Sequence, residues 1–448
     1  MLFPRKRETK YLPTTDEIPT FVGMTIEKMT FQNYYSAVRY LEGLANLPAR
    51  DYQRQRTNPD VYLKRTGYFL RLIGNPDKDL KFVHIAGTAG KGSVASKVQA
   101  GLSATGYKTG LFTSPFATTS IEKIKVDNFY IAPGEFANLV EKLKPAIDEA
   151  YKKSLHGGPS YFEIFVGLAL SYFKEQKCKW VVLEAGLGGR YDATNIIKRP
   201  KVTAITNVGR DHLNVLGMTL NEVAKDKAGI IKNGSKFFTA ETRSDLQKIF
   251  KLTCSRLNIP MKIIGGGDHI ESNNNLAIAI LESLGVRSKE TNLGLKSKLP
   301  CRFETVQKSP RVILDGAHNP DKVGAVVESL KFVKFKRLHL VFGVSLDKDA
   351  RGMLKKLIPQ VDTFYVTRFQ MPFRKVHEPE ALIDLIGRYK PVLHKQAYLD
   401  PFQALDEALK RANKDDLVLV TGSFYLTGEL RARWYSEEKV LRTRRSFS

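Results

Sequence analysis

The stretch VHIAGTAGKGSVAS, residues 83–96, constrains the fold more than any other part of the chain. A buried-strand pattern precedes its glycines, and a helical pattern follows them and ends at Gly106. Such glycines let backbone N–H groups point at phosphate oxygens, and the helix N-terminus adds its dipole. We predict a phosphate-binding loop in which Lys91 reaches the β- and γ-phosphates and Ser93 offers a hydroxyl to Mg²⁺. The alternative is a glycine-rich turn with a solvated lysine.

This loop departs from the general P-loop pattern, in which Ser or Thr directly follows the lysine. Here Lys91 is followed by Gly92 and only then by Ser93. The strand before it and the helix after it still favour a phosphate-binding role.

The alternation of strands and helices predicts two α/β domains. One run extends from the glycine loop to about residue 290, the pattern is irregular over 290–310, and a second run starts at RVILDGAHNP. A chain of 448 residues is too long for one ordinary domain. We therefore predict an N-terminal P-loop mononucleotide-binding α/β domain over 31–298 and a smaller C-terminal Rossmann-like α/β domain over 299–448, with a cleft between them. Residues 1–30 are predicted to form a disordered basic extension.

Composition narrows the class of protein. The three cysteines are scattered and odd in number, which favours neither a disulfide framework nor a zinc site and indicates a reducing compartment. The first residues lack the apolar core of a signal peptide, and no apolar run approaches a membrane span. We expect a cytoplasmic monomer without a membrane partner.

The net charge of +25 keeps a nucleic-acid partner open as a hypothesis. The charge is spread along the whole chain, however, and no nucleic-acid-binding signature accompanies it. We expect small anionic substrates and no nucleic acid.

Three ionisable residues of the first half are candidates for a site. Glu163 lies in the apolar stretch YFEIFVGLAL, where an unpaired carboxylate would be costly to bury, so a metal, a lysine or a surface position must explain it. His212 follows a strand end directly in NVGRDHLNVLG, where a structural histidine and a ligand are equally good interpretations. Lys227, in DKAGIIK, is not singled out by its spacing.

Polar residues of the second half stand at three successive strand ends. These are Asp315, His318 and Asn319 in LDGAHNP, Asp347, Lys348 and Asp349 in VFGVSLDKD, and Gly422 and Ser423 in VTGSFYLTG. Because open parallel sheets bind ligands beyond the carboxyl ends of their strands, these turns predict a binding surface. The residues alone indicate a two-domain nucleotide-binding enzyme that uses Mg²⁺, without specifying its reaction.

Taken together, the motifs resemble the folylpolyglutamate synthase/dihydrofolate synthase family, within the Mur-ligase superfamily of ATP-dependent amide-forming ligases. The matching strings run in family order from about residue 34 to about residue 434, and LEAGLGGRYDATN and DHLNVLG…KAGIIK are the most specific. The resemblance implies that ATP phosphorylates a carboxylate of a pteroate or folate, such as dihydropteroate or a tetrahydrofolate polyglutamate. The amino group of L-glutamate then attacks the acyl phosphate. The implied cofactors are ATP and Mg²⁺.

The resemblance also implies roles for individual positions. It assigns the nucleotide to Gly87, Thr88, Gly90, Lys91, Gly92, Ser93, Asn275, Arg302 and Asp315. It assigns Mg²⁺ to Ser114, Glu163, His212 and Lys227, the last as a carbamylated lysine whose new carboxylate holds a second ion. His318 and Ser423 resemble residues that serve the phosphate or the incoming glutamate, and Asp192 and Asn195 lie near the pterin-bearing substrate. The implied catalytic residues are Lys91, Lys227 and His318.

The chain departs from the family pattern at a few positions. Ala89 stands where asparagine is common, Phe116 follows Ser-Pro where the family has histidine, and the next residues read ATTSIEKI. The acceptor is therefore less constrained than the reaction: dihydrofolate synthase, folylpolyglutamate synthase or both remain open, as does a Mur-type ligase with a non-folate acceptor. Alternatives of another class are a nucleotide-dependent nucleic-acid-binding protein and a degenerate binding module. Lys91, Glu163, His212 and Lys227 speak against the module.

Overall fold

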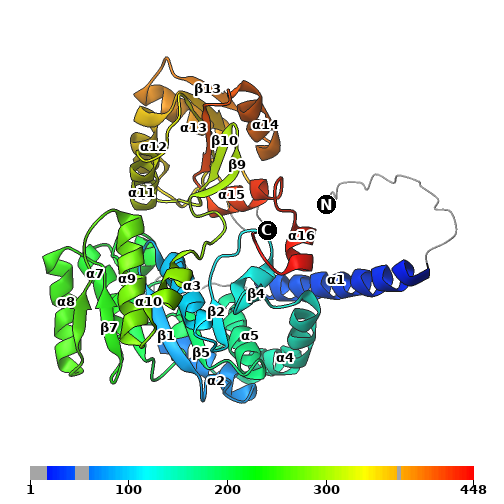
Figure 1. The fold of residues 1–448 in the computed structure, drawn as a ribbon, viewed down its shortest axis with the longest axis vertical. Coiled ribbons are helices and arrows are strands. Elements are labelled where there is room, and N and C mark those ends of the chain that lie inside the picture. Colours follow the sequence, from blue (N-terminus) through cyan, green and yellow to red (C-terminus); the bar gives the residue numbers. More distant parts are fainter. Residues whose placement is uncertain (1–17, 46–59, 371–374, 448) are drawn as a thin grey trace.

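The computed structural model describes residues 18–45, 60–370 and 375–447. Two lobes follow one another along the chain, one built on strands β1–β8 and the other on strands β9–β14 (Figure 1). The predicted α/β class with two domains is confirmed. Of the predicted extension over 1–30, residues 1–17 lie outside the described residues, and from Ile18 the chain forms helix α1 (Ile18–Ala45).

The N-terminal lobe is built on an eight-stranded sheet in the order β4-β3-β2-β5-β1-β6-β7-β8. All neighbouring strands pair in parallel except β2 with β3 and β3 with β4. The strands are β1 (Lys81–Ala86), β2 (Thr109–Phe112), β3 (Ile124–Val126), β4 (Phe129–Tyr130), β5 (Trp180–Glu184), β6 (Val202–Ile205), β7 (Lys236–Thr239) and β8 (Met261–Ile263).

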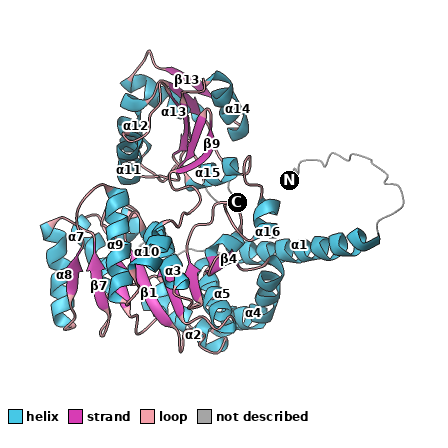
Figure 2. Cartoon of the chain, in the orientation of Figure 1, coloured by secondary structure: helices cyan, strands magenta, loops and turns pink. Residues whose placement is uncertain are grey.

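Helices cover both faces of this sheet (Figure 2). Since successive strand residues point to opposite faces, Phe82 packs with α1, α2, α4 and α5, whereas Val83 packs with α3 and α9. The sheet is therefore buried on both sides, as parallel sheets usually are. Besides α1, the helices of this lobe are α2 (Asp60–Leu72), α3 (Lys91–Ala104), α4 (Pro133–Lys153), α5 (Tyr161–Glu175), α6 (Leu213–Leu216), α7 (Leu220–Lys227), α8 (Ser244–Arg256), α9 (His269–Ser283) and α10 (Ser288–Leu295), with 3₁₀ turns η1 (Ser120–Lys123), η2 (Ala193–Ile196) and η3 (Ala228–Ile230).

The C-terminal lobe is built on a six-stranded sheet in the order β13-β12-β11-β14-β10-β9. Only the pairing of β9 with β10 is antiparallel among the described strands of this sheet. The strands are β9 (Glu304–Lys308), β10 (Arg311–Leu314), β11 (Leu338–Phe342), β12 (Thr363–Val366), β13 (His394–Ala397) and β14 (Leu417–Thr421). Helices α11 (Pro320–Leu330), α12 (Ala350–Leu357) and α13 (Pro379–Tyr389) pack on one face, and α14 (Pro401–Arg411) and α15 (Phe424–Arg431) on the other.

The segment that looked irregular from sequence, residues 290–310, contains the end of α10 and the antiparallel strand β9. Strand β9 is an edge strand that alternates buried and exposed positions only weakly, so its periodicity is hard to detect.

The end of the chain returns to the N-terminal lobe. Helix α16 (Glu437–Thr443) lies beside α1 and β4 (Figure 1). Its Val440 and Leu441 are fully buried in the same apolar cluster as α1, α4 and α5. The predicted domain over 299–448 therefore describes the second sheet, while its last helix completes the core of the first lobe.

We expect Leu441→Ala to lower the free energy of unfolding by about 2–4 kcal/mol, because it removes a buried side chain and leaves a cavity. Leu155→Ala is the matched control, since Leu155 is 97% exposed in the same lobe. Urea denaturation of both variants measures the difference. Equal values for the two variants would show that α16 contributes nothing to this core.

Candidate active site

The predicted phosphate loop joins the end of β1 to the start of α3. Gly87 and Gly90 have φ values of 146° and 80°, which side chains rarely adopt. A Cβ on Gly87 would collide with Thr206, and one on Gly90 would collide with Asn273. The loop is therefore a close-packed strand-to-helix turn whose N–H groups and helix N-terminus lie together, as an anion site requires.

The loop is tied to the segment after β6. Asn207 Oδ1 accepts hydrogen bonds from the backbone N–H groups of Thr88 and Ala89, at 3.2 and 2.9 Å. The Thr88 hydroxyl accepts one from the N–H of Gly209 at 2.8 Å. Lys91 Nζ donates to the carbonyl of Gly87 at 3.0 Å and so lies over its own loop. Asn207 was not singled out from sequence, although it follows a predicted strand.

A buried carboxylate, Glu184 at the end of β5, lies against this loop. A Cβ on Gly92 would be 3.0 Å from Glu184 Oε2, and the same oxygen accepts the backbone N–H of Ser114 at 3.2 Å. Burial raises the pKa of Glu184, and the charge of Lys91 opposes this rise. The structure thus brings Glu184, Lys91 and Ser114 together at the N-terminus of α3.

The structure does not bring Glu163 to this place. Its two carboxylate oxygens accept from Nη2 and Nε of Arg65, both at 2.7 Å, and it also accepts the N–H of Ser160 as part of the capping box of α5. The structure therefore places Glu184, and not the predicted Glu163, beside the phosphate loop. The signal that could have found Glu184 is its position at a strand end, directly before AGLGGR.

The donors at this place fit a divalent metal that binds together with a nucleotide. Among the described residues, no three His, Cys, Asp or Glu side chains are grouped as an all-protein metal site. Mg²⁺ commonly takes one or two carboxylates and completes its shell with water and phosphate oxygens. The Glu184 carboxylate and the Ser114 hydroxyl suit that pattern.

Lys227, at the end of α7, is 2% exposed. Burial and then the charge of Lys91 lower the pKa of Lys227 to about 7, against the opposing effect of Asp226 and Asp211. A large fraction of this amine is therefore neutral at physiological pH. A neutral amine is the form that reacts with electrophiles such as carbon dioxide.

One carboxylate, Asp211, gathers basic side chains from both lobes. It lies 3.0 Å from Lys322 Nζ and 3.2 Å from Lys348 Nζ, both of the C-terminal lobe. The Nε2 atoms of His212 and His318 are 3.6 and 3.8 Å away. Burial raises the pKa of Asp211, but the four neighbours outweigh burial and hold this pKa well below its usual range.

The two predicted histidines of this cluster are held neutral. Burial and then the charge of Lys322 keep the pKa of His318 well below its usual value. His318 Nδ1 donates to the carbonyl of Gly316 at 2.8 Å, so its Nε2 accepts from Lys322 Nζ at 2.9 Å. Burial lowers the pKa of His212 to about 4. Sequence analysis found both histidines but missed Asp211 and Lys322.

The residues predicted to contact the nucleotide beyond the loop lie on α9 and at the start of the C-terminal lobe. The amide of Asn273, on α9, lies against Gly90. Asn275 is two residues further on the same helix and so points about 200° away from Asn273. The structure therefore brings Asn273 to the loop in place of Asn275.

Arg302 and Asp315 lie next to each other at the start of the C-terminal lobe. The Asp315 carboxylate accepts the N–H groups of Phe303 and Ala317, both at 2.8 Å. Burial raises the pKa of Asp315, and the charge of Arg302 opposes this rise. The Arg302 guanidinium lies 4.6 Å from the centre of the Phe424 ring.

The residues predicted near the substrate have structural contacts. Asp192 caps η2 by accepting the N–H groups of Leu187 and Thr194, at 2.8 and 3.0 Å. Asn195 Nδ2 donates to the carbonyl of Arg190 at 2.9 Å, while its buried Oδ1 has no partner among the described residues.

Ser423 is the third of these residues, and it caps α15 by accepting from the N–H of Tyr425 at 3.2 Å.

The loop after β5 also depends on a buried histidine of β1. His84 is 0% exposed, and its Nε2 lies 2.7 Å from Thr194 Oγ1. Because the Thr194 hydroxyl donates to Asp192 at 2.5 Å, His84 Nε2 donates to Thr194. Burial lowers the pKa of His84 from 6.5 to about 3.

We expect His84 to make the fold acid-labile. In the folded protein it stays neutral, whereas the unfolded chain takes up a proton below pH 6.5, so stability is lost as the pH falls from 6.5 towards 3. Between pH 7.5 and about 5.5 the free energy of unfolding should fall by about 1.4 kcal/mol more in the unaltered protein than in His84→Gln. Urea denaturation at both pH values measures this, and equal losses would contradict it.

Two family models match the chain. Residues 85–261 match the Mur ligase middle domain, and residues 301–424 match the glutamate ligase domain of Mur ligases. Among the described residues, no helix has the length and hydropathy needed to cross a bilayer.

Relatives and solved structures agree with these models. The chain is 31% identical over 414 residues to the dihydrofolate synthase/folylpolyglutamate synthase of Bacillus subtilis, which covers 83% of this chain and 94% of that protein. It superposes with a TM-score of 0.81 and 25% identity on Mycobacterium tuberculosis folylpolyglutamate synthase complexed with ADP, over 90% of this chain and 99% of that one.

A third similar structure is a bifunctional folylpolyglutamate synthase/dihydrofolate synthase with Mn, AMPPNP and L-glutamate bound. Its TM-score is 0.73 and its identity 25%, over 83% of this chain and 93% of that one. The resemblance inferred from sequence is confirmed, and the chain belongs to the dihydrofolate synthase/folylpolyglutamate synthase family of ATP-dependent Mur-type ligases.

Proposed function

We propose that this chain joins L-glutamate to a carboxylate of a pteroate or folate, through an acyl phosphate made from ATP and with Mg²⁺. The observation that carries the proposal is the convergence of the phosphate loop, Glu184 and the Asp211 cluster where the strand ends of the two lobes meet. The relatives named for this activity support it.

The loop and α3 hold the triphosphate in this proposal. The N–H groups at the start of α3 and the Lys91 ammonium neutralise phosphate oxygens. Glu184 and Ser114 would hold Mg²⁺, whose charge would polarise the γ-phosphate towards attack by the acceptor carboxylate. Manganese in a similar structure supports the use of a divalent metal.

Lys227 would hold a second metal as a carbamate. Its neutral amine attacks carbon dioxide, forms a nitrogen–carbon bond and releases one proton, which leaves an anionic carbamate. The pKa of about 7 supports this role because the neutral amine is available. The Asn195 side chain, which donates to the carbonyls of Arg190 and Gly229, keeps the loop after β5 against the end of α7.

The C-terminal lobe would supply cations for the second half-reaction. Lys322 and Lys348 are held by Asp211 at the boundary between the lobes and can exchange this carboxylate for the acyl phosphate. Neutral His318, fixed by its bond to Gly316, presents Nε2 as an acceptor for the ammonium group of glutamate. Ser423 and Arg302 lie on the same side, on strand ends of this lobe.

The experiment that tests this function compares two acceptors directly. Purified protein with ATP and Mg²⁺ should release phosphate, and incorporate labelled glutamate, only when L-glutamate and either dihydropteroate or tetrahydrofolate are both present. Lys91→Ala should lower kcat by at least about 100-fold, because it removes charge stabilisation of the transferred phosphoryl group. Phosphate release that does not depend on any folate acceptor would reject the folate assignment.

Nucleic-acid binding that persists at about 0.2 M salt would favour the alternative of another class. The monomeric state, the cytoplasmic location and the lack of a nucleic-acid partner stay predictions.

The two glutamates give a discriminating pair of variants for the metal. Glu184→Gln should raise the Mg²⁺ concentration needed for half-maximal activity by at least about tenfold, because it removes a charged ligand. Glu163→Gln should leave that concentration unchanged and lower the free energy of unfolding by about 1–3 kcal/mol, since it weakens the pair with Arg65. Titration of Mg²⁺ and urea denaturation measure both. If Glu163→Gln raised the required Mg²⁺ concentration and Glu184→Gln did not, Glu163 would be the metal ligand.

A further inference from the structure

The loop of residues 114–123 leaves the site at one end and is fixed within the N-terminal lobe at both ends. Ser114 is bonded to Glu184, as described. At the other end the buried Lys123 Nζ donates to Tyr161 Oη at 2.8 Å and lies 3.6 Å from the centre of the Phe165 ring. Because β2 is the neighbour of β5 in the sheet, this loop lies beside the loop that carries Asp192 and Asn195.

The middle of this loop is organised by one carboxylate, Glu122. Its Oε2 accepts the backbone N–H groups of Ala117 and Thr118, both at 2.7 Å, and that of Thr119 at 3.4 Å. Three convergent N–H groups on one oxygen fix the backbone of residues 117–119. The position of Glu122 therefore sets the position of these residues.

Glu122 is in turn held by the end of the chain. The Ser446 hydroxyl donates to Glu122 Oε1 at 2.6 Å, so it accepts from the Tyr130 hydroxyl at 2.7 Å. The N–H of Tyr130 donates to the carbonyl of Arg444 at 3.0 Å, and Arg444 Nε donates to the carbonyl of Tyr130 at 2.7 Å. We call residues 437–447 the C-terminal tail.

Arg431, at the end of α15, joins the same network from the C-terminal lobe. Its guanidinium is 0% exposed and pairs with Glu304, with 2.9 Å from Nε to Oε2. It also donates to Thr118 Oγ1 at 3.2 Å and to the carbonyl of Ser446. Loop, tail and C-terminal lobe thus meet at one buried cation.

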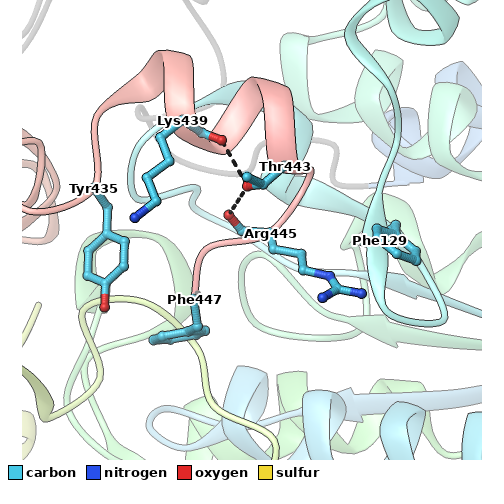
Figure 3. A pocket seen from close by; sticks show the side chains of 6 residues that line it. All are labelled: Phe129, Tyr435, Lys439, Thr443, Arg445 and Phe447. Atoms are coloured by element: carbon cyan, nitrogen blue, oxygen red, sulfur yellow. Dashed lines mark hydrogen bonds between the residues drawn. The ribbon is translucent and has the colours of Figure 1, made fainter.

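A cavity of about 300 Å³ borders the last residues of the tail. It is lined by Phe129, Tyr435, Lys439, Thr443, Arg445 and Phe447 (Figure 3). Thr443 closes the turn after α16 by donating to the carbonyls of Lys439 and Arg445, at 2.8 and 3.3 Å. Two direct polar links join the tail to the loop among the described residues: the Ser446 hydroxyl donates to Glu122, and the Thr119 hydroxyl donates to Glu437 Oε1 at 2.9 Å. Of these, Ser446 is the one that bears on Glu122, which holds the N–H groups of residues 117–119.

We propose that Ser446 and Arg431 are positioning residues through which the C-terminal tail holds residues 117–119 beside the acceptor substrate. The proposal rests on the proposed function for the place of the acceptor, next to the loop after β5. It implies that the tail sets the affinity for the pteroate or folate and leaves the affinity for ATP unchanged, because the phosphate loop makes its own contacts with the segment after β6.

The test uses Ser446→Ala and the matched control Thr443→Val, which removes a hydroxyl from the same tail without touching the loop. Ser446→Ala should raise the KM for the acceptor by about five- to tenfold, the effect of losing a hydrogen bond to a charged group, with the KM for ATP and kcat within about twofold. Thr443→Val should leave all three unchanged. An unchanged acceptor KM in Ser446→Ala, or equal effects of the two variants, would overturn the proposal.

A second measurement separates this proposal from the proposed function. Hydrogen exchange of the amides of residues 117–119, which donate to Glu122, should accelerate at least about fivefold in Ser446→Ala and not in Thr443→Val. Unchanged exchange would overturn the positioning role even in an active enzyme. Accelerated exchange in a protein without folate-dependent activity would support the tail's hold on the loop and reject the proposed function alone.

Discussion

The charge balance around Asp211 is the constraint on which the rest of the site depends. Lys322 and Lys348 form ion pairs with the N-terminal lobe at this carboxylate, which is their one such partner in the part of the chain that the structure describes. Beyond it, burial and then the charge of Lys91 lower the pKa of Lys227 to about 7, and burial lowers the pKa of Lys322 to about 8. A site with more cations than carboxylates favours a polyanion, because each added negative charge relieves repulsion in a poorly solvated space. Asp211 holds Lys322 and Lys348 together, and in the proposed function a phosphate takes its place.

A second buried charge cluster, around Arg431, has a different consequence. Its partners are Glu304, at the end of a strand, and Thr118, in a loop. Both accept hydrogen bonds from the Arg431 guanidinium, so this buried cation finds its partners within the protein. Removing one partner of such a pair would leave an uncompensated buried charge, so the cluster holds its segments in a single arrangement. Because Glu304 also accepts the N–H of Cys301 at 2.8 Å, the same cluster fixes the backbone next to Arg302. The buried pair of Arg431 and Glu304 therefore contacts both sides of the proposed site: the backbone next to Arg302 on the nucleotide side and Thr118 on the acceptor side.

Features that depend on a local sequence pattern could be predicted from the sequence. Features that depend on contacts between residues far apart in the chain could not. The strand-to-helix loop was found because its glycines are required locally: they have positive φ values, and neighbouring side chains approach their backbone closely. Glu163 and Glu184 both lie in apolar stretches, and nothing local shows that Arg65, far away in sequence, neutralises the first of them.

The same limit explains the remaining differences. A shift of two residues on α9 turns a side chain to the opposite side of the helix, which a run of three asparagines cannot reveal. The return of α16 to the first lobe depends on long-range packing of Val440 and Leu441 that no periodicity encodes.

The two departures from the family pattern differ in their physical consequences. Phe116 lies 5.0 Å from Lys123 Nζ, within the aromatic surroundings of that buried amine, so its side chain serves the packing of the lobe. Ala89 lies in the phosphate loop itself, where its N–H is held by Asn207 Oδ1 and its carbonyl by the Thr206 hydroxyl at 2.6 Å. A phosphate that takes the N–H groups of Thr88 and Ala89 must displace the Asn207 carbonyl oxygen. Position 89 therefore lies in the proposed nucleotide site, whereas the loop that contains Phe116 carries residues 117–119, which we propose to lie beside the acceptor.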